Sequence, residues 1–409
     1  MSKKIVFVGL SGGVDSAVSS ALLKKQGYDV VGVFIKTWHP DFLSCNEEEE
    51  RRDAMRISAY LDIPFLTFDF EDVYKKEVAD YMINEYKMGR TPNPDVMCNK
   101  EVKFGAFFKK AIEMGADFVA TGHYASKKNL KNFPTFALGD KKTGDRHGSL
   151  NSSSFSLIKG VDPLKDQSYF LWTLKQEQLK KILFPIGHLK KTEVRKLAKK
   201  LNLPVAEKHD SQGICFLGDI DLKEFLKYYI KEKKGKVVLA PSGVEGSEKG
   251  EIIGHHNGVV FYTLGERHGF VITKKSPNDG AYYVVGKDIK KNILFVAQGG
   301  NLLSESPRKI LLNFRSRLGS SASVAFHKKD FHLALENVNW ISETPKPDKI
   351  YTAQIRYHGE FLFCKINMSK RHFDMKKVEV IFDKPILVAS GQSCVIYDAN
   401  ICLGGGVVV

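Results

Sequence analysis

The sequence predicts an α/β protein in which a doubly wound parallel sheet is followed by two β-rich parts. The first half of the chain alternates short apolar runs with helical patterns, and this alternation is typical of a parallel sheet. A glycine-rich turn joins the first run to the first helix. After about residue 209 the helical patterns give way to short apolar runs separated by turns. This change indicates a small central β module followed by a β-barrel.

Strands and helices are expected to alternate through the N-terminal half. The apolar runs with the length of buried strands lie at 5–10, 30–35, 65–68 and 118–120. The helical patterns lie at 17–26, 47–61, 102–114 and 190–201. Gly27 and Gly115 follow two of these patterns, as glycine often does where a helix ends. Strands joined through helices in this way form a parallel sheet.

Changes in composition divide the chain into three predicted domains. They span 1–208, 209–301 and 302–409. Residues 127–156 of the first domain are polar and rich in lysine, asparagine, glycine and serine, so we expect a surface insertion or mobile loop there. The later domains contain β-like runs, which lie at 237–239, 259–262, 281–285, 351–357 and 361–363.

Bulk composition places the chain among ordinary globular proteins. Of its 409 residues, 43% are hydrophobic and 27% are charged. No apolar run approaches the ~20 residues that span a bilayer, and the N-terminus runs directly into a strand, so we expect no signal peptide and a cytoplasmic protein. The net charge of +15 fits a nucleic-acid partner, but it fits a lysine-rich surface that favours solubility equally well.

The sharpest motif is Ser-Gly-Gly-Val-Asp-Ser at 11–16, directly between the first strand and the first helix. Gly12 and Gly13 permit a tight turn and a close approach of the backbone to a ligand. The free N–H groups and the positive dipole end of the helix favour an anion. A Gly-Gly turn alone would be structural, but the complete motif at this junction predicts phosphate binding.

This loop resembles the pyrophosphate loop of the ATP pyrophosphatases, which split ATP between the α and β phosphates. It has neither the spacing of a Walker A loop nor the G-x-G-x-x-G spacing of a dinucleotide fold. Asp15 cannot balance a phosphate directly, because two anions repel. The resemblance implies that Asp15 acts with Mg²⁺, while the hydroxyls of Ser11 and Ser16 donate to phosphate oxygens.

Cys98 stands out among the six cysteines because of its neighbours. Two prolines stiffen the approach to it, and we expect a helix to begin within a few residues. A position near a helix N-terminus, with Lys100 and Lys103 close by, favours the thiolate. Asp95, three residues upstream, is placed to relay a proton. The alternative for Cys98 is a small apolar residue at the start of a helix.

Cys215 lies between two glycines that suit a mobile loop, where the α/β half gives way to the β half. Such a boundary is a common place for a site, and a buried structural cysteine is the alternative. The other cysteines stand at 45, 364, 394 and 402. The six form no C-x-x-C pair and no zinc spacing.

Seven blocks together resemble the tRNA-specific 2-thiouridylase family, and they extend from the phosphate loop into the last domain. The blocks are 9–16, 91–104, 120–124, 165–169, 211–219, 356–357 and 390–394. Other ATP pyrophosphatases share only the first block, so the combination is specific. The resemblance implies an N-terminal sheet like that of the adenine nucleotide α-hydrolases. The polar insertion looks longer than the family needs.

Three sets of site residues follow from the resemblance. Cys98, Cys215 and Asp95 would be catalytic. The ATP site would comprise Gly9, Leu10, Ser11, Gly12, Gly13, Val14, Asp15, Ser16, Ile35 and Gly122. The tRNA contacts would be Asn93, Pro94, Asp95, His123, Lys165, Asp166, Gln167, Arg356, Tyr357 and Gln392. For His123, Arg356 and Tyr357, ordinary packing or a place on a strand surface is the plainer interpretation.

The implied reaction puts sulfur on the wobble uridine of a tRNA anticodon. ATP adenylates O2 of the uridine, because oxide is a poor leaving group and AMP is a good one. Cys215 carries a persulfide received from a sulfur-relay partner, and its terminal sulfur attacks C2. Cys98 frees the sulfur and leaves a Cys98–Cys215 disulfide, which a reductant reopens. Transient disulfides of this kind suit a reducing cytosol.

Other interpretations stay open on the sequence. An amide-forming synthetase would use the same loop, but it needs an ammonia source and no glutaminase domain is visible. A cytidine-thiolating relative would carry C-x-x-C pairs for an iron–sulfur cluster. A non-catalytic RNA-binding module would hold a relic loop, against which the intact loop and both cysteines argue. The basic residues of the helix at 190–201 form either a solvated surface or a phosphate-facing one.

Overall fold

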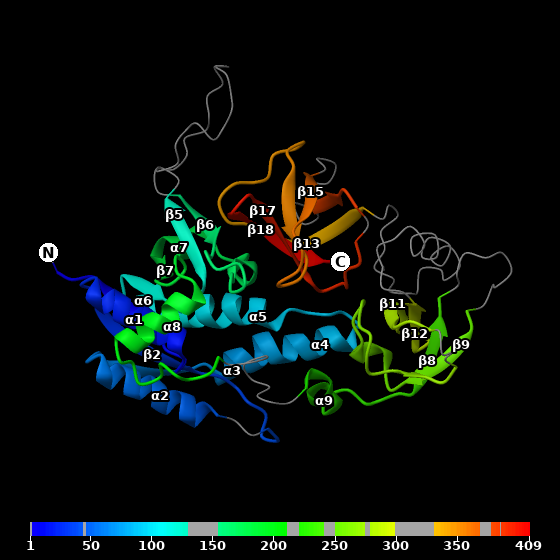
Figure 1. Cartoon of the computed structure of the whole chain (residues 1–409), viewed down its shortest axis with the longest axis horizontal. Helices are drawn as coiled ribbons and strands as arrows, with labels where there is room; N and C mark the ends of the chain where they lie inside the picture. The colour runs from blue at the N-terminus through cyan, green and yellow to red at the C-terminus, as the bar shows by residue number, and fades with distance from the viewer. Residues whose placement is uncertain are drawn as a thin grey trace, which may run out of the picture.

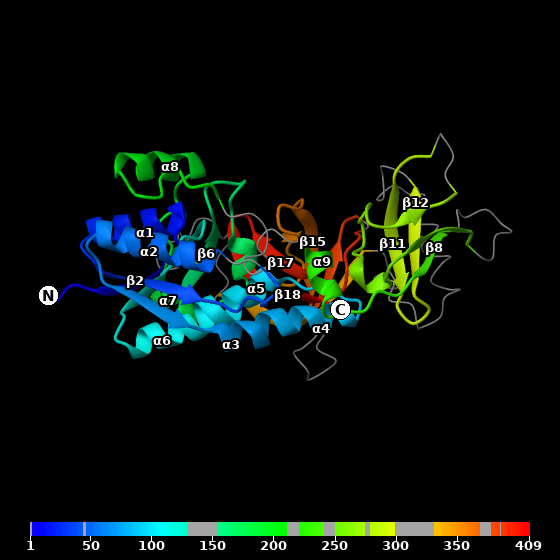
Figure 2. The ribbon, with the colours of Figure 1, turned by 90° about the horizontal axis from the view of Figure 1, so that it is seen from below.

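The computed structural model describes nine segments of the chain. They are 2–43, 46–129, 154–210, 221–240, 250–274, 279–298, 331–368, 378–384 and 386–409. A parallel sheet with its helices lies at one end of the molecule, a β-barrel in the middle and a smaller sheet at the other end (Figure 1). The same order along the long axis is seen from below (Figure 2).

Five parallel strands form the N-terminal sheet, in the order β3-β2-β1-β4-β7. Their bounds are β1 Ile5–Gly9, β2 Asp29–Lys36, β3 Phe65–Asp69, β4 Phe118–Ala120 and β7 Ile182–Leu183. The predicted parallel sheet is confirmed. The strand order reverses at β1, because β2 and β4 lie on opposite sides of it. Such a switch point leaves a crevice at the carboxyl ends of the strands.

Helices cover both faces of this sheet. In Figure 2, α1, α2 and α8 lie above the strands and α6 and α7 lie below them. Their bounds are α1 Val14–Lys25, α2 Glu47–Tyr60, α6 Phe108–Glu113, α7 Gln176–Lys181 and α8 Lys191–Lys200. None of the helices in the described segments has the length and apolar character needed to cross a membrane.

The helix predicted at 102–114 begins earlier than expected. Its sections are α5 Pro94–Met97, the π-helical η2 Cys98–Phe107 and then α6. Pro94 occupies the first helical position, where its fixed φ suits a helix. Oδ1 of Asn93 caps this end by accepting a hydrogen bond from the N–H of Val96 at 3.1 Å. Cys98 therefore lies one turn inside the helix, and the expectation that the helix begins after it was wrong.

A second long helix was not predicted. It consists of α3 Glu71–Tyr74, η1 Lys75–Asp80 and α4 Tyr81–Lys87, and it reaches from the parallel sheet toward the smaller sheet (Figure 1). One apolar core contains Phe7 of β1, Met82 of α4 and Leu294 of the smaller sheet. The two sheets are therefore joined through a shared core.

The smaller sheet has the strand order β10-β9-β8-β12-β11. Its strands are β8 Gly235–Leu239, β9 Ile252–His256, β10 Val271–Ile272, β11 Tyr282–Asp288 and β12 Ile293–Gln298, and α9 Leu222–Lys227 precedes them. Strands β8 and β12 are parallel, whereas the other neighbours are antiparallel. This sheet is the predicted central β module.

The apolar run at 259–262 is not a strand, contrary to the prediction. Val259–Phe261 form a short 3₁₀ turn, η7, after Gly258, which has a φ of +148°. The N–H of Val259 donates to Oδ1 of Asn292 at 3.1 Å instead of to a neighbouring strand. Val259 and Phe261 are buried. A short apolar run thus indicates burial without fixing the backbone conformation.

A six-stranded antiparallel barrel forms the C-terminal body, in the order β13-β16-β15-β14-β17-β18. Pairing between β13 and β18 closes it. Its strands are β13 His332–Trp340, β14 Tyr351–Gln354, β15 Leu362–Asn367, β16 Val378–Phe382, β17 Ser393–Asp398 and β18 Ile401–Val408. The predicted β-barrel is confirmed.

A hairpin from the N-terminal half is attached to the barrel. It consists of β5 Ala125–Asn129 and β6 Phe155–Lys159. Strand β6 pairs with the start of β18, where Ile158 lies opposite Ile401 and Leu157 opposite Cys402. The two ends of the predicted polar insertion at 127–156 are thus strands, and its residues 130–153 lie outside the described segments.

Candidate active site

The phosphate loop, residues 9–16, connects the carboxyl end of β1 to the start of α1. Gly12 has a φ of +71°, which glycine adopts without strain. A Cβ at Gly12 would collide with the carbonyl oxygen of Glu50 on α2. A Cβ at Gly122, after β4, would lie 2.9 Å from the backbone nitrogen of Ser16. Neither position has room for a side chain.

Hydroxyl groups brace the loop from within. Oγ of Ser16 donates to the carbonyl of Gly13 at 3.1 Å and accepts from the N–H of Ser11 at 3.3 Å. The hydroxyl oxygens of Ser11 and Ser16 lie 3.4 Å apart. The first N–H groups of a helix have no partner within the helix. This braced end of α1 is therefore suited to hold a phosphate.

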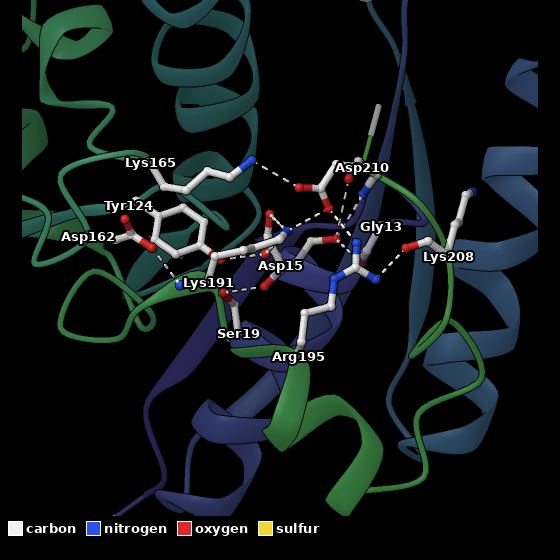
Figure 3. A network of polar contacts seen from close by, with 12 residues as sticks. Gly13, Asp15, Ser19, Tyr124, Asp162, Lys165, Lys191, Arg195, Lys208 and Asp210 are labelled. Atoms are coloured by element: carbon white, nitrogen blue, oxygen red, sulfur yellow. Dashed lines mark hydrogen bonds and ion pairs between the residues drawn. The ribbon is translucent and has the colours of Figure 1, made fainter. Parts of the chain in front are cut away.

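Asp15, the second residue of α1, is held by two side chains. The hydroxyl of Tyr124 donates to Oδ1 at 2.8 Å, and Nζ of Lys191 donates to Oδ1 and Oδ2 at 2.8 and 2.9 Å (Figure 3). Burial and the adjacent Asp15 charge raise the pKa of Tyr124. Tyr124 therefore stays protonated and remains a donor.

Lys191 also contacts a second carboxylate, that of Asp210, at 2.8 Å. Asp210 is further contacted by Nη2 of Arg195 at 2.6 Å and by Nζ of Lys165 at 3.0 Å. Burial would raise the pKa of Asp210, but hydrogen bonds from Lys191 and Lys165 lower it to about 2. Asp210 is therefore ionised, and three cations and two carboxylates meet beside the loop.

Some basic side chains of α8 point toward the phosphate loop and others point toward solvent. Lys191 and Arg195, one turn apart, both extend toward the loop (Figure 3). Lys199 instead pairs with Glu207 at 2.9 Å, where both side chains are more than half exposed. The phosphate-facing interpretation of this helix fits Lys191 and Arg195, and the solvated interpretation fits Lys199.

Cys98 lies in the helix that packs against the carboxyl end of the sheet. Its side chain is buried and belongs to the same apolar core as Val33 and Phe107. The ring of Phe107 comes within 3.7 Å of where a Cβ on Gly9 would lie, and Ile35 within 3.9 Å of it. The helix thus connects Cys98 with the side of the loop where the resemblance puts adenosine.

Asp95 lies in the first turn of the same helix, three residues before Cys98. Burial raises the pKa of Asp95, and the positive charge of Lys103 opposes this shift. A carboxyl group whose pKa is raised is more readily protonated, which favours a part in proton transfer. Nδ2 of Asn99 donates to the backbone carbonyl of Asp95 at 2.9 Å, which fixes this turn.

His123 is buried beneath the same helix. Its Nδ1 lies 2.8 Å from Oγ1 of Thr121, and its ring centre lies 5.8 Å from that of Phe104. Burial, with a contribution from the charge of Lys103, lowers the pKa of His123 well below its usual value. The ring is therefore neutral, and its surroundings fit the packing interpretation.

Lys165, Asp166 and Gln167 support the loop side of the site. Lys165 pairs with Asp210, as described above. Oδ1 of Asp166 accepts from the N–H of Gly160 at 2.9 Å, and Oε1 of Gln167 accepts from the N–H of Tyr124 at 3.0 Å. Lys165 therefore holds Asp210 directly, and Gln167 fixes the backbone of Tyr124, whose hydroxyl holds Asp15. Asp166 fixes the turn between Gly160 and Ser168.

Arg356 and Tyr357 follow β14 and lie beside the 3₁₀ turn η5, Ser168–Leu171. The ring centre of Tyr357 is 4.4 Å from that of Phe170 and 6.3 Å from that of Tyr169. Nη2 of Arg356 donates to the carbonyl of Leu264 at 3.0 Å, which ties the barrel to the central segment. Tyr169 is in turn hydrogen-bonded with Asn93, the cap of the Cys98 helix.

Segments from all three bodies meet at Thr91. Its N–H donates to the carbonyl of Ser390 at 2.8 Å, and its carbonyl accepts from Nε2 of Gln392 at 3.1 Å. Its hydroxyl lies 3.1 Å from that of Thr263. Thr91 comes three residues before Pro94, so the barrel and the central segment together fix the entry to the Cys98 helix.

The predicted site residues thus fall into two groups. The loop group consists of 9–16, Ile35, Gly122 and 165–167, together with the ion-pair cluster formed by Asp15, Lys165, Lys191, Arg195 and Asp210. The junction group consists of 93–95, Cys98, Arg356, Tyr357 and Gln392. Cys215 lies outside the described residues, as does Cys45.

The other described cysteines are in environments that make their thiols unreactive. Cys364, Cys394 and Cys402 are buried in or against the barrel. Burial raises the pKa of all three thiols, to about 12 for Cys364 and for Cys402. The thiolate is the reactive form of cysteine. These three residues therefore serve packing.

Four residues beside the loop were not predicted as site residues: Tyr124, Asp210, Lys191 and Arg195. Tyr124 and Asp210 stand in or next to blocks that carried the family resemblance, but no local pattern showed that they would reach Asp15 or Lys191. Lys191 lies far from the loop in sequence and was one of several lysines in its helix. Only the tertiary structure separates it from the others.

The parallel sheet with its switch point at β1, the braced glycine loop and the cations around it define the class of the protein. They are the features of a PP-loop ATP pyrophosphatase fold.

Comparisons with known proteins narrow this class. Three family models match: "tRNA methyl transferase HUP domain" over residues 4–219, "tRNA methyl transferase PRC-barrel domain" over 223–298 and "Aminomethyltransferase beta-barrel domain" over 331–408. The tRNA-specific 2-thiouridylase MnmA of Geobacillus thermodenitrificans is 40% identical over 408 residues, covering 98% of this chain and 94% of the relative. That of Nitrosomonas europaea is 38% identical and covers 100% and 99%.

The chain therefore belongs to the tRNA-specific 2-thiouridylase family. The family models carry methyltransferase names, but the full-length similarity is to proteins named 2-thiouridylases. Among solved structures, the U34-tRNA thiolase NcsA of Methanococcus maripaludis matches with a TM-score of 0.31 at 19% identity, over 56% of this chain and 67% of that one.

Proposed function

We propose that the protein is a tRNA-uridine 2-sulfurtransferase that uses ATP to replace the C2 oxygen of a wobble uridine by sulfur. The observation that carries this proposal is the complete phosphate loop within a chain that is 40% identical, over 98% of its length, to a tRNA-specific 2-thiouridylase. The work is divided among an ATP-binding catalytic domain at 1–208, a central domain at 209–301 and a barrel domain at 302–409.

ATP binds on the loop group. Residues 9–16 hold the phosphates through the N–H groups at the start of α1, and Ile35 and Gly122 lie beside the adenosine. Asp15 offers one carboxylate, and Mg²⁺ in such sites is usually bound by one or two carboxylates together with phosphate oxygens. Mg²⁺ held there would neutralise charge on the phosphates.

The junction group receives the tRNA anticodon. Asn93, Pro94 and Asp95 line the target base, which leaves its stack to reach them. The tRNA contacts are Lys165, Asp166, Gln167, Arg356, Tyr357 and Gln392, and the net charge of +15 favours the polyanion. The buried His123, implied as a tRNA contact by the family resemblance, instead packs beneath the Cys98 helix. Asp95 exchanges the proton that the reaction moves, for which its raised pKa suits it.

The chemistry has two steps. In the first, O2 of the uridine attacks the α-phosphate of ATP and pyrophosphate leaves. In the second, the terminal sulfur of a Cys215 persulfide attacks C2 and AMP leaves with the oxygen. The Cys98 thiolate then attacks Sγ of Cys215, so the sulfur–sulfur bond breaks and its electron pair goes to the sulfur on C2.

The cycle needs two external partners. A persulfide donor or sulfur-relay protein recharges Cys215, and a reductant opens the Cys98–Cys215 disulfide. A disulfide that forms and opens in every cycle fits a reducing compartment, and we place the reaction in the cytoplasm.

Mass analysis of tRNA nucleosides tests the proposal. Unmodified tRNA is incubated with the full-length protein, Mg²⁺-ATP, a persulfide donor and a reductant, with ATP omitted as the control. We expect 2-thiouridine together with AMP release that depends on tRNA. A methylated nucleoside, thiolated cytidine or no modified nucleoside would contradict it.

A further inference from the structure

The phosphate-loop motif contains no basic residue, yet three cations gather in the ion-pair cluster beside it. Lys191, Arg195 and Lys165 all reach Asp210, and Lys191 alone also reaches Asp15. The three cations come from α8 and from the segment before η5, and the side chains of Lys191 and Arg195 are mostly buried.

The cluster lies at the N-terminal end of α1, next to the phosphate loop. Lys191 bridges Asp210 to Asp15, and Asp15 is the second residue of α1. The cations therefore stand at the same helix end where the loop is shaped for a phosphate. A phosphate bound at this end of α1 would lie near Asp15 and near Lys191, which holds Asp15.

Asp210 occupies these cations as a phosphate would. Its two oxygens accept from all three: Oδ1 lies 2.8 Å from Lys191 and 2.6 Å from Arg195, and Oδ2 lies 3.0 Å from Lys165. Arg195 also donates to the backbone carbonyls of Ala206 and Lys208, so its guanidinium is held in place independently of Asp210. Arg195 would thus keep its position if Asp210 left.

We propose that Lys191, Arg195 and Lys165 form the second half of the triphosphate site and bind the β and γ phosphates, and that Asp210 is an internal counter-anion which these phosphates displace. This rests on the proposed ATP site. Asp15 keeps its contact with Lys191, and the pyrophosphate released after adenylation leaves from the same cations. Lys165, assigned above to tRNA by resemblance, becomes a phosphate ligand in this proposal.

The two possible roles of Asp210 predict opposite changes in nucleotide affinity when it is replaced. If the ion pairs only fastened α8 to α1, replacing Asp210 would loosen the cluster and weaken nucleotide binding. If Asp210 competes with phosphate, its neutral amide analogue removes the competitor and strengthens binding. Charge-assisted hydrogen bonds are among the stronger polar contacts, so either effect is measurable.

The test is titration calorimetry of the full chain without tRNA, with Mg²⁺-ATP, pyrophosphate and AMP as ligands. Lys191→Met should weaken ATP and pyrophosphate binding about tenfold or more and leave AMP affinity within about twofold. Asp210→Asn should tighten ATP and pyrophosphate binding severalfold, again without changing AMP. The matched controls are Lys199→Met and Glu207→Gln, which alter an ion pair of similar length on the outer side of the same helix.

The outcomes separate this inference from the proposed function. Weaker or unchanged ATP and pyrophosphate binding in Asp210→Asn, or an equal loss of AMP and ATP affinity in Lys191→Met, overturns the second half-site while ATP binding to the loop stands. Wild-type protein that binds neither ATP nor pyrophosphate overturns both. Thermal unfolding of each variant, compared with its control, shows whether the fold is retained.

Discussion

The phosphate loop and the Cys98 junction are built in different ways. The loop consists of consecutive residues at one strand–helix connection, and its glycines and hydroxyls satisfy one another locally. The junction is assembled at Thr91 from the parallel-sheet half, the central segment and the barrel. A local site can be recognised from a short motif, whereas an assembled site depends on the whole chain reaching its fold.

The largest expected effect concerns the two cysteines of the assembled site. Cys98→Ser and Cys215→Ser should each abolish thiolation with little change in tRNA affinity, because serine cannot carry or release a persulfide sulfur. Nucleoside mass analysis and a tRNA binding assay measure the two properties. With Cys215 replaced, no transferable persulfide should form, whereas Cys98→Ser should still be charged by the donor.

The matched control is Cys402→Ser. This thiol is also buried, and burial raises its pKa to about 12, so it stays in the unreactive thiol form. We expect near-normal thiolation from it. Wild-type protein stopped after one turnover without reductant should show a Cys98–Cys215 disulfide by peptide mapping. Full turnover by either Cys98→Ser or Cys215→Ser would contradict the two-cysteine mechanism.

The second-largest expected effect concerns Asp15 of the phosphate loop. Asp15→Ala should reduce AMP and pyrophosphate formation by on the order of 100-fold or more, since charge control at the phosphates is lost. Binding of tRNA should be almost unchanged, because the junction group is separate from Asp15. Release of AMP is measured with saturating tRNA. If the variant released AMP at the normal rate, the assignment of the loop would fail.

A glycine pair tests how tightly the loop is packed. Gly12→Ala and Gly27→Ala both place a side chain at positive φ, which costs about 1 kcal/mol of stability. Only at Gly12 does the new Cβ meet the backbone of α2, whereas at Gly27 nothing lies within 4 Å. Denaturant unfolding should show a larger loss for Gly12→Ala, and only that variant should lose ATP binding. Equal losses would contradict the contact between loop and α2.

The smallest effect concerns a buried lysine near the junction. Nζ of Lys287 donates to the carbonyls of Gly89 and Tyr262 at 2.8 and 2.7 Å, and burial lowers the pKa of Lys287 from 10.5 to about 8. Between these values the unfolded chain binds more protons than the folded one, so stability should rise with pH from about 8 to 10.5. Lys287→Met should flatten this rise in a series of unfolding curves, and an unchanged slope would show that Lys287 is not its source.

Much of this structure could be predicted from the sequence, through local motifs and the family resemblance. Four of the five strands of the parallel sheet and the phosphate loop follow from apolar runs and glycine positions, whereas β7, only two residues long, was not predicted. The helix at 71–87 was missed although Val78, Met82 and Tyr86 recur at its buried face with helical spacing. The run at 259–262 was misjudged because burial alone does not distinguish a strand from a turn.

The ion pairs beside the loop could not have been predicted. Asp15, Lys191 and Asp210 are far apart in sequence, and each is an ordinary charged residue in its own segment. Their contact depends on how α8 packs over α1. The entry to the Cys98 helix depends in the same way on hydrogen bonds from Ser390 and Gln392, which belong to the last part of the chain.

The pairing of β6 with β18 has a consequence for the synthesis of the protein. Strand β6 ends at Lys159 and its partner begins only at Ile401, so at ribosomal rates of about 5–20 residues per second the partner emerges roughly 10 to 50 s later. During that interval one side of β6 is an open strand edge, which invites pairing with another chain. Nascent chains that stall after residue 159 should therefore be more prone to aggregation than the complete chain.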